Sequence, residues 1–192
     1  MARNAKRKSA ASGQPKKKEV PFYWVMLGVV AAVVAGYYFF IAADYTAQAV
    51  PSYAEEDVAH EGAFTAVHEM GAGPRIPFLP KGGPQPKISI PADYHSFGSI
   101  GPRDVVRRKF IVRNDGDAPL TISRAFTTCG CTTAEFSANV IPPGKLAVVT
   151  MVFDAGFHDT RGQTVDRGII IENNDPANPE AEIWARAAVG WR

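Results

Sequence analysis

The two cysteines of this chain lie close together in Cys129-Gly-Cys131, and the 192 residues contain no other cysteine. Residues i and i+2 of an extended segment project to the same face, so both thiols are expected to point at one spot. Three roles fit this spacing. In the first, the pair is structural and lies at a strand end, either free or bridged. In the second, it exchanges with a partner thiol, with Gly130 permitting unusual dihedral angles. In the third, its soft thiolates bind copper(I) or zinc.

A metal or redox motif normally contains more than this pair. The usual Cys-x-x-Cys spacing is absent, and no residues complete a set of four ligands, although His158 or Met151 could assist. We therefore favour a structural role and expect no metal and no cofactor. Copper or zinc binding, or thiol redox chemistry, through Cys129, Cys131 and His158 stays open as the alternative.

The remaining polar residues do not suggest catalysis. Four histidines are scattered without metal-ligand spacing: His60, His68, His95 and His158. The chain has no Cys-x-x-Cys-His for covalent haem, no Gly-x-Ser-x-Gly, no phosphate-binding glycine loop and no His-Glu-x-x-His. His95 and Ser96 are adjacent, but a nucleophile needs a separately positioned base and an oxyanion hole. The sequence predicts a protein that is not an enzyme.

Short β segments separated by turn residues follow from residue 87 to the C-terminus. They are expected at residues 87–90, 105–113, 120–126, 132–136, 145–153, 164–172 and 181–189. About seven strands without a helical period predict an antiparallel, immunoglobulin-like β-sandwich over residues 87–192. Alternating apolar positions give the expected core: Phe110, Val112, Leu120, Ile122, Val149, Met151, Phe153, Ile169, Ile171 and Trp184.

Residues 21–43 form an uncharged apolar run with aromatic residues at both ends. A helix of this length crosses a hydrocarbon core of about 30 Å, and it exceeds the apolar region of a cleaved signal peptide, although Ala47-Gln-Ala49 resembles a cleavage site. The basic tail, residues 1–20, lies on its N-terminal side. The positive-inside rule then predicts a single-pass anchor in the cell inner membrane, with a cytoplasmic N-terminus and a periplasmic or extracellular main domain.

Charge is distributed unevenly along the chain. Of the 21 basic and 19 acidic residues, seven basic and one acidic precede residue 21, which leaves 14 basic against 18 acidic in the remainder. The basic tail can contact anionic lipid. The mildly acidic remainder offers no stripe for phosphates, so no nucleic-acid partner is expected.

Residues 44–86 are expected to form an extended arm. Proline and glycine are dense in residues 71–86 and break regular structure. Pure tethers are poor in apolar residues, whereas this segment contains Phe64, Ile76, Phe78 and Leu79. These four residues favour an arm that lies along a partner.

Several motifs together resemble a known family. They are Phe110-x-x-x-Asn114-x-Gly116-x-x-Pro119-Leu120-x-Ile122, Thr128-Cys-Gly-Cys-Thr132, Ile141-x-Pro-Gly144, Phe153-Asp154 and Asn173-Asn-Asp-Pro176. The region from Ile88 to Val189 resembles a bacterial domain family of unknown function with a Cys-Gly-Cys-Thr signature, related to the ASH/hydin/major-sperm-protein immunoglobulin-like domains. The resemblance implies a seven-stranded sandwich, typically outside the cytoplasm, and no enzymatic activity.

The expected function is that of a non-catalytic, membrane-anchored accessory subunit. It would dock on the extracytoplasmic face of a larger respiratory, photosynthetic or envelope complex and stabilise it; its expected partners are the lipid bilayer and the other subunits. Small residues at four-residue spacing, Gly28, Ala32 and Gly36, allow a neighbouring helix to approach closely. Trp191, at the end of the chain, is difficult to bury within the sandwich and is expected to contact a partner.

Overall fold

The computed structural model describes residues 22–47, 52–69 and 82–192. The chain divides near residue 44 into two compact units, a helix and a β domain, and each is described by itself. The helix α1 covers Phe22–Ala47 and is made almost entirely of apolar residues. The expected helix is therefore present. Among the described residues, however, no helix combines the length and the hydropathy that crossing a membrane requires.

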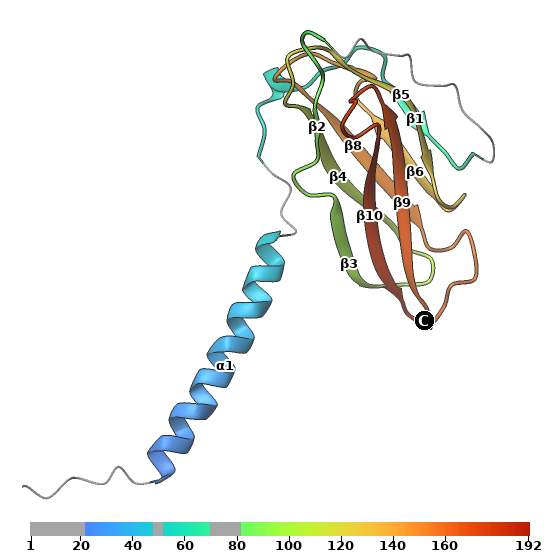
Figure 1. The fold of residues 1–192 in the computed structure, drawn as a ribbon. Helices are drawn as coiled ribbons and strands as arrows, with labels where there is room; N and C mark the ends of the chain where they lie inside the picture. The colour runs from blue at the N-terminus through green and yellow to red at the C-terminus, as the bar shows by residue number, and fades with distance from the viewer. Residues whose placement is uncertain (1–21, 48–51, 70–81) are drawn as a thin grey trace, which may run out of the picture. The chain divides into compact units, whose positions relative to one another are not determined.

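The β domain is a sandwich of ten strands in two five-stranded sheets (Figure 1). One sheet has the order β1-β6-β8-β4-β2 and the other β3-β10-β9-β5-β7. The strands are β1 (Phe64–Ala66), β2 (Ile88–Ser89), β3 (Tyr94–Ile100), β4 (Val105–Asn114), β5 (Leu120–Thr127), β6 (Thr132–Phe136), β7 (Val140–Ile141), β8 (Leu146–Asp154), β9 (Thr164–Asn173) and β10 (Glu180–Val189). A short 3-10 turn, η1 (Glu55–Asp57), precedes them.

The sequence prediction underestimates the number of strands in this sandwich. All seven expected strands are present, but β1, β3 and β7 add three more. Strand β3 lies between the strands expected at residues 87–90 and 105–113, where no strand was expected, yet it pairs in parallel with β10 and makes the sandwich mixed rather than purely antiparallel. Strands β1 and β7 are too short for an alternating pattern to be visible.

Part of the expected arm belongs to the sandwich. Strand β1 pairs with β6, and the ring of Phe64 stacks on Phe136 with centroids 4.6 Å apart. Upstream, Val58 bridges to Leu146. The domain boundary expected at residue 87 therefore differs from the structure, because residues 64–66 already pair within the sheet.

The core follows the two-residue period of the strands. Every expected core residue is buried except Trp184, which is only partly buried. On β10 the inward positions are those of Ala181, Ile183, Ala185, Ala187 and Val189. The adjacent Trp184 must then project to the outer face, where an added Cβ on Gly168 would meet its ring.

One end of the sandwich, which we call the asparagine end, consists of residues 85–88 and the turns 114–119 and 173–179. Its buried Asn114 donates through Nδ2 to the carbonyl oxygens of Ala118 and Ile141, both at 2.8 Å. Its Oδ1 accepts from the amides of Gly116 at 3.0 Å and Lys87 at 3.3 Å. One side chain therefore holds three separate segments.

The second turn of this end is built in the same way. Oδ1 of Asn173 accepts from the amide of Asp175, and the Asp175 carboxylate accepts from the amide of Ile88 at 2.9 Å. Oδ1 of Asn174 accepts from the amide of Thr121 at 2.8 Å. The polar residues of the Asn-x-Gly and Asn-Asn-Asp-Pro motifs therefore form hydrogen bonds with backbone groups, as buried polar residues require.

Candidate functional site

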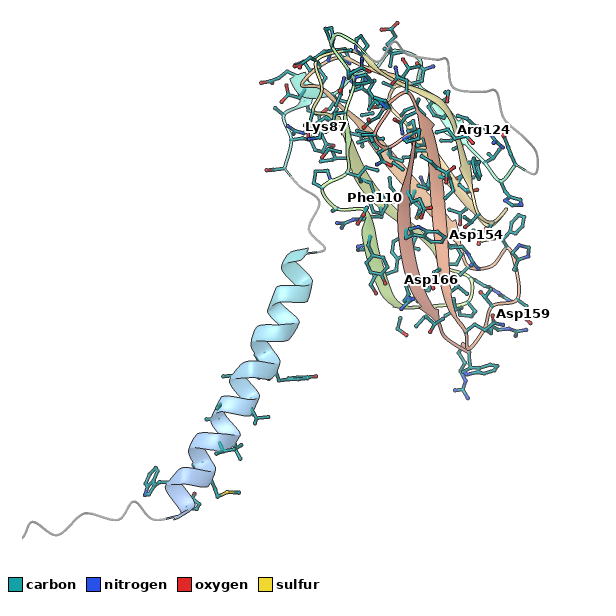
Figure 2. All side chains as sticks on the ribbon, viewed as in Figure 1. Lys87, Phe110, Arg124, Asp154, Asp159 and Asp166 are labelled. Carbon is teal, nitrogen blue, oxygen red and sulfur yellow. A yellow bond between two sulfur atoms is a disulfide. The ribbon has the colours of Figure 1, made fainter. Side chains whose placement is uncertain are left out.

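The opposite end, which we call the disulfide end, consists of the turn 128–131, the loops 101–104 and 155–163, and residues 190–192. Figure 2 shows Asp159 of this end far from Lys87 of the asparagine end. Cys129 and Cys131 lie in the turn between β5 and β6 and form a disulfide, with 5.2 Å between their Cα atoms. The pair is bridged rather than free. In this state it has no thiolate to offer a metal.

Hydrogen bonds hold this turn independently of the disulfide. The amide of Thr132 donates to the carbonyl oxygen of Cys129 at 3.0 Å. The buried hydroxyl of Thr127 lies 3.1 Å from the carbonyl oxygen of Cys129 and 2.9 Å from that of Thr132. The hydroxyl of Thr128 accepts from the amide of Gly168 at 2.9 Å. These contacts join the turn to strand β9.

The two sulfur-bearing residues have different surroundings. Cys131 is only 4% exposed and belongs to a small apolar cluster with Phe153, Val165 and Val189, whereas Cys129 is half-buried at the edge of that cluster. The amide of Cys131 donates to Sγ of Cys129 at 3.1 Å. The Cys131 Sγ lies 3.6 Å from the hydroxyl oxygen of Thr132.

An exposed aromatic ring lies beside the disulfide. Phe157 is 57% exposed, and a Cβ added to Gly130 would lie 3.4 Å from its Cε1. The imidazole of His158 packs edge-on against the Phe157 ring, with centroids 4.8 Å apart. Phe157 and His158 also line a pocket of about 690 Å³ together with Arg103, Arg161 and Trp191. The disulfide end thus combines a disulfide bond, exposed aromatic rings and charged side chains.

Several of the charged groups near this pocket are engaged in local contacts. Arg161 forms two hydrogen bonds with Asp159, at 2.8 and 2.9 Å, and these lower the pKa of the Asp159 carboxyl and raise the pKa of Arg161. The carboxylates of Asp104 and Asp154 accept from the amides of Gly101 and Gly156 and hold their loops. These carboxylates stabilise loop conformation.

The described residues contain no group of three or more His, Cys, Asp or Glu side chains that could hold a metal ion. Met151 is fully buried and faces the large core, so it cannot assist Cys129 and Cys131 as a ligand. His95 packs edge-on against Phe97, and burial, followed by the charge of Arg108, lowers the pKa of its imidazole. It pairs with no nucleophile that the structure describes.

The residues expected to bind partners are scattered. Gly28, Ala32 and Gly36 are exposed on α1. Phe64 packs on Phe136 of its own sheet, so its placement does not support a partner contact. Trp191 is 77% exposed, as expected. Three further residues lie outside the described residues: Ile76, Phe78 and Leu79.

Sequence reasoning missed Phe157. Its surroundings, Asp154-Ala-Gly-Phe-His-Asp159, show an isolated apolar residue among turn and polar residues. That pattern is a weak signal for an exposed ring. Its position beside Gly130, 27 residues away along the chain, is visible only in the folded structure.

The structure is similar to several solved proteins. A protein of unknown function from Porphyromonas gingivalis W83 matches with 23% identity and a TM-score of 0.47, over 55% of this chain and 46% of that one. The ASH/PapD-like domain 7 of human CEP192 matches with 10% identity and a TM-score of 0.41, over 63% of this chain and 96% of that one. The YadV chaperone matches with 13% identity and a TM-score of 0.38, over 55% and 52% of the two chains.

At these identities the similarity concerns the fold alone, and the match spans less than half of the Porphyromonas protein. No curated protein matches this chain. These comparisons test neither the Cys-Gly-Cys-Thr signature nor the membrane anchor, and both stay predictions. The family model described as "Protein of unknown function (DUF1573)" matches residues 88–186, more than half of the chain. The protein is therefore a member of the DUF1573 family.

Proposed function

We propose that this protein is a non-catalytic, membrane-anchored accessory subunit that docks on the extracytoplasmic face of a larger membrane complex and stabilises it. The observation that carries the proposal is the apolar character of α1 on all its sides. Met26, Val29, Val30 and Val33 are between 47% and 67% exposed, and no charged residue occurs in residues 21–43. A helix that is apolar all round requires lipid or protein around it.

The flanks of this helix support an orientation. Six lysine and arginine residues in two clusters, residues 6–8 and 16–18, precede the apolar run of residues 21–43, and Asp44 follows that run within α1. Tyr23 and Trp24 lie in its first part and Tyr37 and Tyr38 in its last part, and aromatic residues of this kind prefer membrane–water boundaries. The proposal therefore places the N-terminus in the cytoplasm and the β domain outside it.

The β domain supports a docking role. Its most distinctive polar residues, such as Asn114 and Asn173, are occupied with backbone groups. Its exposed large side chains include Phe157 and Trp191, both at the disulfide end. Exposed aromatic residues clustered at one end are typical of contact sites.

The first experiment tests the anchor. A reporter that is active only outside the cytoplasm is fused after Val50, so that the fusion protein keeps residues 1–50. We expect activity and recovery in the membrane fraction after an alkaline carbonate wash. An inactive fusion, or release by the wash, contradicts the anchor.

The second experiment tests the accessory role. The double variant Gly28→Leu/Gly36→Leu places bulk on the small-residue face of α1, and Val30→Leu/Val34→Leu is its matched control on the other side. After gentle detergent extraction, we expect the wild type and the control to migrate with other subunits on a native gel, whereas the glycine variant migrates alone. If the wild type also migrates as a monomer, the accessory role is wrong even when the anchor stands.

A further inference from the structure

We propose that the Cys129–Cys131 disulfide is redox-active and exchanges two electrons with a dithiol of a partner protein, with Cys129 carrying the sulfur that is attacked. This role goes beyond docking and does not depend on the membrane anchor. It is carried by three features of the disulfide end. These are the unequal burial of the two cysteines, the hydrogen bonds around them, and the exposed ring of Phe157.

Unequal burial selects the sulfur that a partner can reach. Cys131 is packed with Phe153 and Val165 and is 4% exposed, whereas Cys129 is half-buried between the exposed Thr128 and Gly130. Thiol–disulfide exchange requires direct access of the attacking sulfur to one sulfur of the bond. Attack at Cys129 is therefore favoured over attack at Cys131.

The hydrogen bonds favour the reduced form of the same residue. The amide of Cys131, 3.1 Å from Sγ of Cys129, is placed to donate to a thiolate at that sulfur. Donors to the charged form stabilise it, as at other reactive cysteines. The hydroxyl of Thr132, 3.6 Å from Sγ of Cys131, can donate in the same way to the second sulfur.

The fold does not depend on the bond for its shape. The disulfide closes a loop over only one intervening residue, and in the chain-entropy model so short a loop stabilises the fold less than a longer one does. The turn is also held by the Thr132 amide on the Cys129 carbonyl and by the Gly168 amide on Thr128. The bond can therefore open while the turn stays in place.

The exchange proceeds in two balanced steps. A partner thiolate attacks Sγ of Cys129; the Cys129–Cys131 bond breaks, a mixed disulfide forms, and Cys131 leaves as a thiolate that takes up a proton. The second thiol of the partner, after losing its proton, then attacks the partner sulfur of the mixed disulfide and releases Cys129. The partner dithiol is oxidised to a disulfide, the pair is reduced to two thiols, and two protons pass to it. The reverse sequence oxidises the pair.

Phe157 supplies a surface for the partner beside the bond. Its ring is exposed and adjoins Gly130, so a protein that reaches Cys129 also contacts this ring. Tyr94, at the start of β3, is also an exposed aromatic residue, and only Phe157 lies within 4 Å of a Cβ added to Gly130. Tyr94 therefore provides a matched control for Phe157.

The first test compares the two sulfurs in the purified full-length protein in mild detergent. Cys131→Ser leaves Cys129 free, and Cys129→Ser leaves Cys131 free; each is reacted with oxidised glutathione and the mixed disulfide is followed by mass spectrometry. We expect Cys129 to react at least about tenfold faster, because it is the more accessible of the two sulfurs. Equal rates, or faster reaction of Cys131, overturn the assignment of the attacked sulfur. Thermal unfolding of both variants verifies that they are folded.

The second test concerns reversible exchange in the wild type. Reduced bacterial thioredoxin should reduce the pair without denaturant, oxidised glutathione should restore it, and thermal unfolding should show a folded domain in both states. Reduction that occurs only in denaturant, or that unfolds the domain, overturns the redox role. Phe157→Ala should slow reduction by thioredoxin several-fold while leaving reduction by dithiothreitol unchanged, and Tyr94→Ala should change neither. An equal slowing by both variants overturns the role of Phe157.

Discussion

The two ends of the sandwich use polar and apolar residues in opposite ways. At the asparagine end the polar side chains are inside: Asn114 and Asn173 are fully buried and Asp175 is 3% exposed. At the disulfide end apolar rings are outside, with Phe157 and Trp191 mostly exposed. Buried polar groups must be matched by hydrogen bonds, whereas exposed rings leave apolar surface uncovered.

The asparagine end stabilises the fold, whereas the disulfide end presents apolar side chains on the surface. The motifs Asn114-x-Gly116 and Asn173-Asn-Asp-Pro176 attract attention in the sequence, and their side chains are used within the domain. The exposed rings of the disulfide end carry little sequence signal. The asparagine end therefore explains stability, and the disulfide end is the better place to look for partners.

The largest effect is expected from Asn114→Ala. This variant removes a side chain that makes four hydrogen bonds to backbone groups and leaves buried donors and acceptors unpaired. We expect the free energy of unfolding to fall by about 3 kcal/mol. Chemical denaturation of the full-length protein in mild detergent measures it. The exposed Asn178→Ala is the matched control and should change the value by less than about 0.5 kcal/mol. Similar losses in both variants would contradict the stabilising role of the buried Asn114 hydrogen bonds.

The next effect concerns Gly116, in the same turn. A Cβ at this position would collide with the carbonyl oxygen of Gln85 and lie 2.5 Å from the amide nitrogen of Lys87. Because these are backbone atoms, they cannot rotate away, and Gly116→Ala should cost about 2 kcal/mol of unfolding free energy. Gly82→Ala is the control, since nothing lies within 4 Å of the added Cβ. An equal cost in both variants would contradict the close approach.

A smaller effect is expected from the disulfide end. Replacing Cys129 and Cys131 together by serine opens a three-residue loop, and the chain-entropy model gives a loss of about 1.6 kcal/mol. The same denaturation measurement applies, with the oxidised wild type as reference, and the reduced wild type should match the double variant. A loss larger than that of Asn114→Ala would show that the disulfide, rather than the asparagine network, dominates stability.

The smallest effect is expected between the two ends, at His95 on β3. Burial, and secondarily the charge of Arg108, lower the pKa of this imidazole, so the fold favours its neutral form. The contribution of the His95 imidazole to the free energy of unfolding is therefore present above the pKa of about 6.5 that it has in the unfolded chain. That contribution is lost as the pH falls through the lower pKa of the folded protein. We expect the melting temperature to fall between pH 7.5 and pH 5, and His95→Gln to reduce that fall. The exposed His60→Gln is the control, and an unchanged pH profile in His95→Gln would contradict the prediction.

Much of this fold can be read from the sequence because strands with a buried face repeat every two residues. That period located all seven long or strongly apolar segments and all of the expected core except Trp184. It fails where two large apolar residues are adjacent, as in Ile183-Trp184, because either phase is then plausible locally. It also fails for β3, which is stabilised by pairing with a distant strand rather than by its own pattern.

For the candidate site, what the sequence indicated and what only the structure showed are easier to separate. Residue types and local spacing were sufficient to single out Cys129 and Cys131, to propose that they point at one spot, and to identify an apolar segment preceded by basic residues. Only the folded chain decided that the cysteines are bridged, that Cys131 is buried while Cys129 is half-buried, and that Phe157 lies beside them. The reason is physical: spacing along a strand follows from local backbone geometry, whereas burial and neighbours depend on which distant segments pack together.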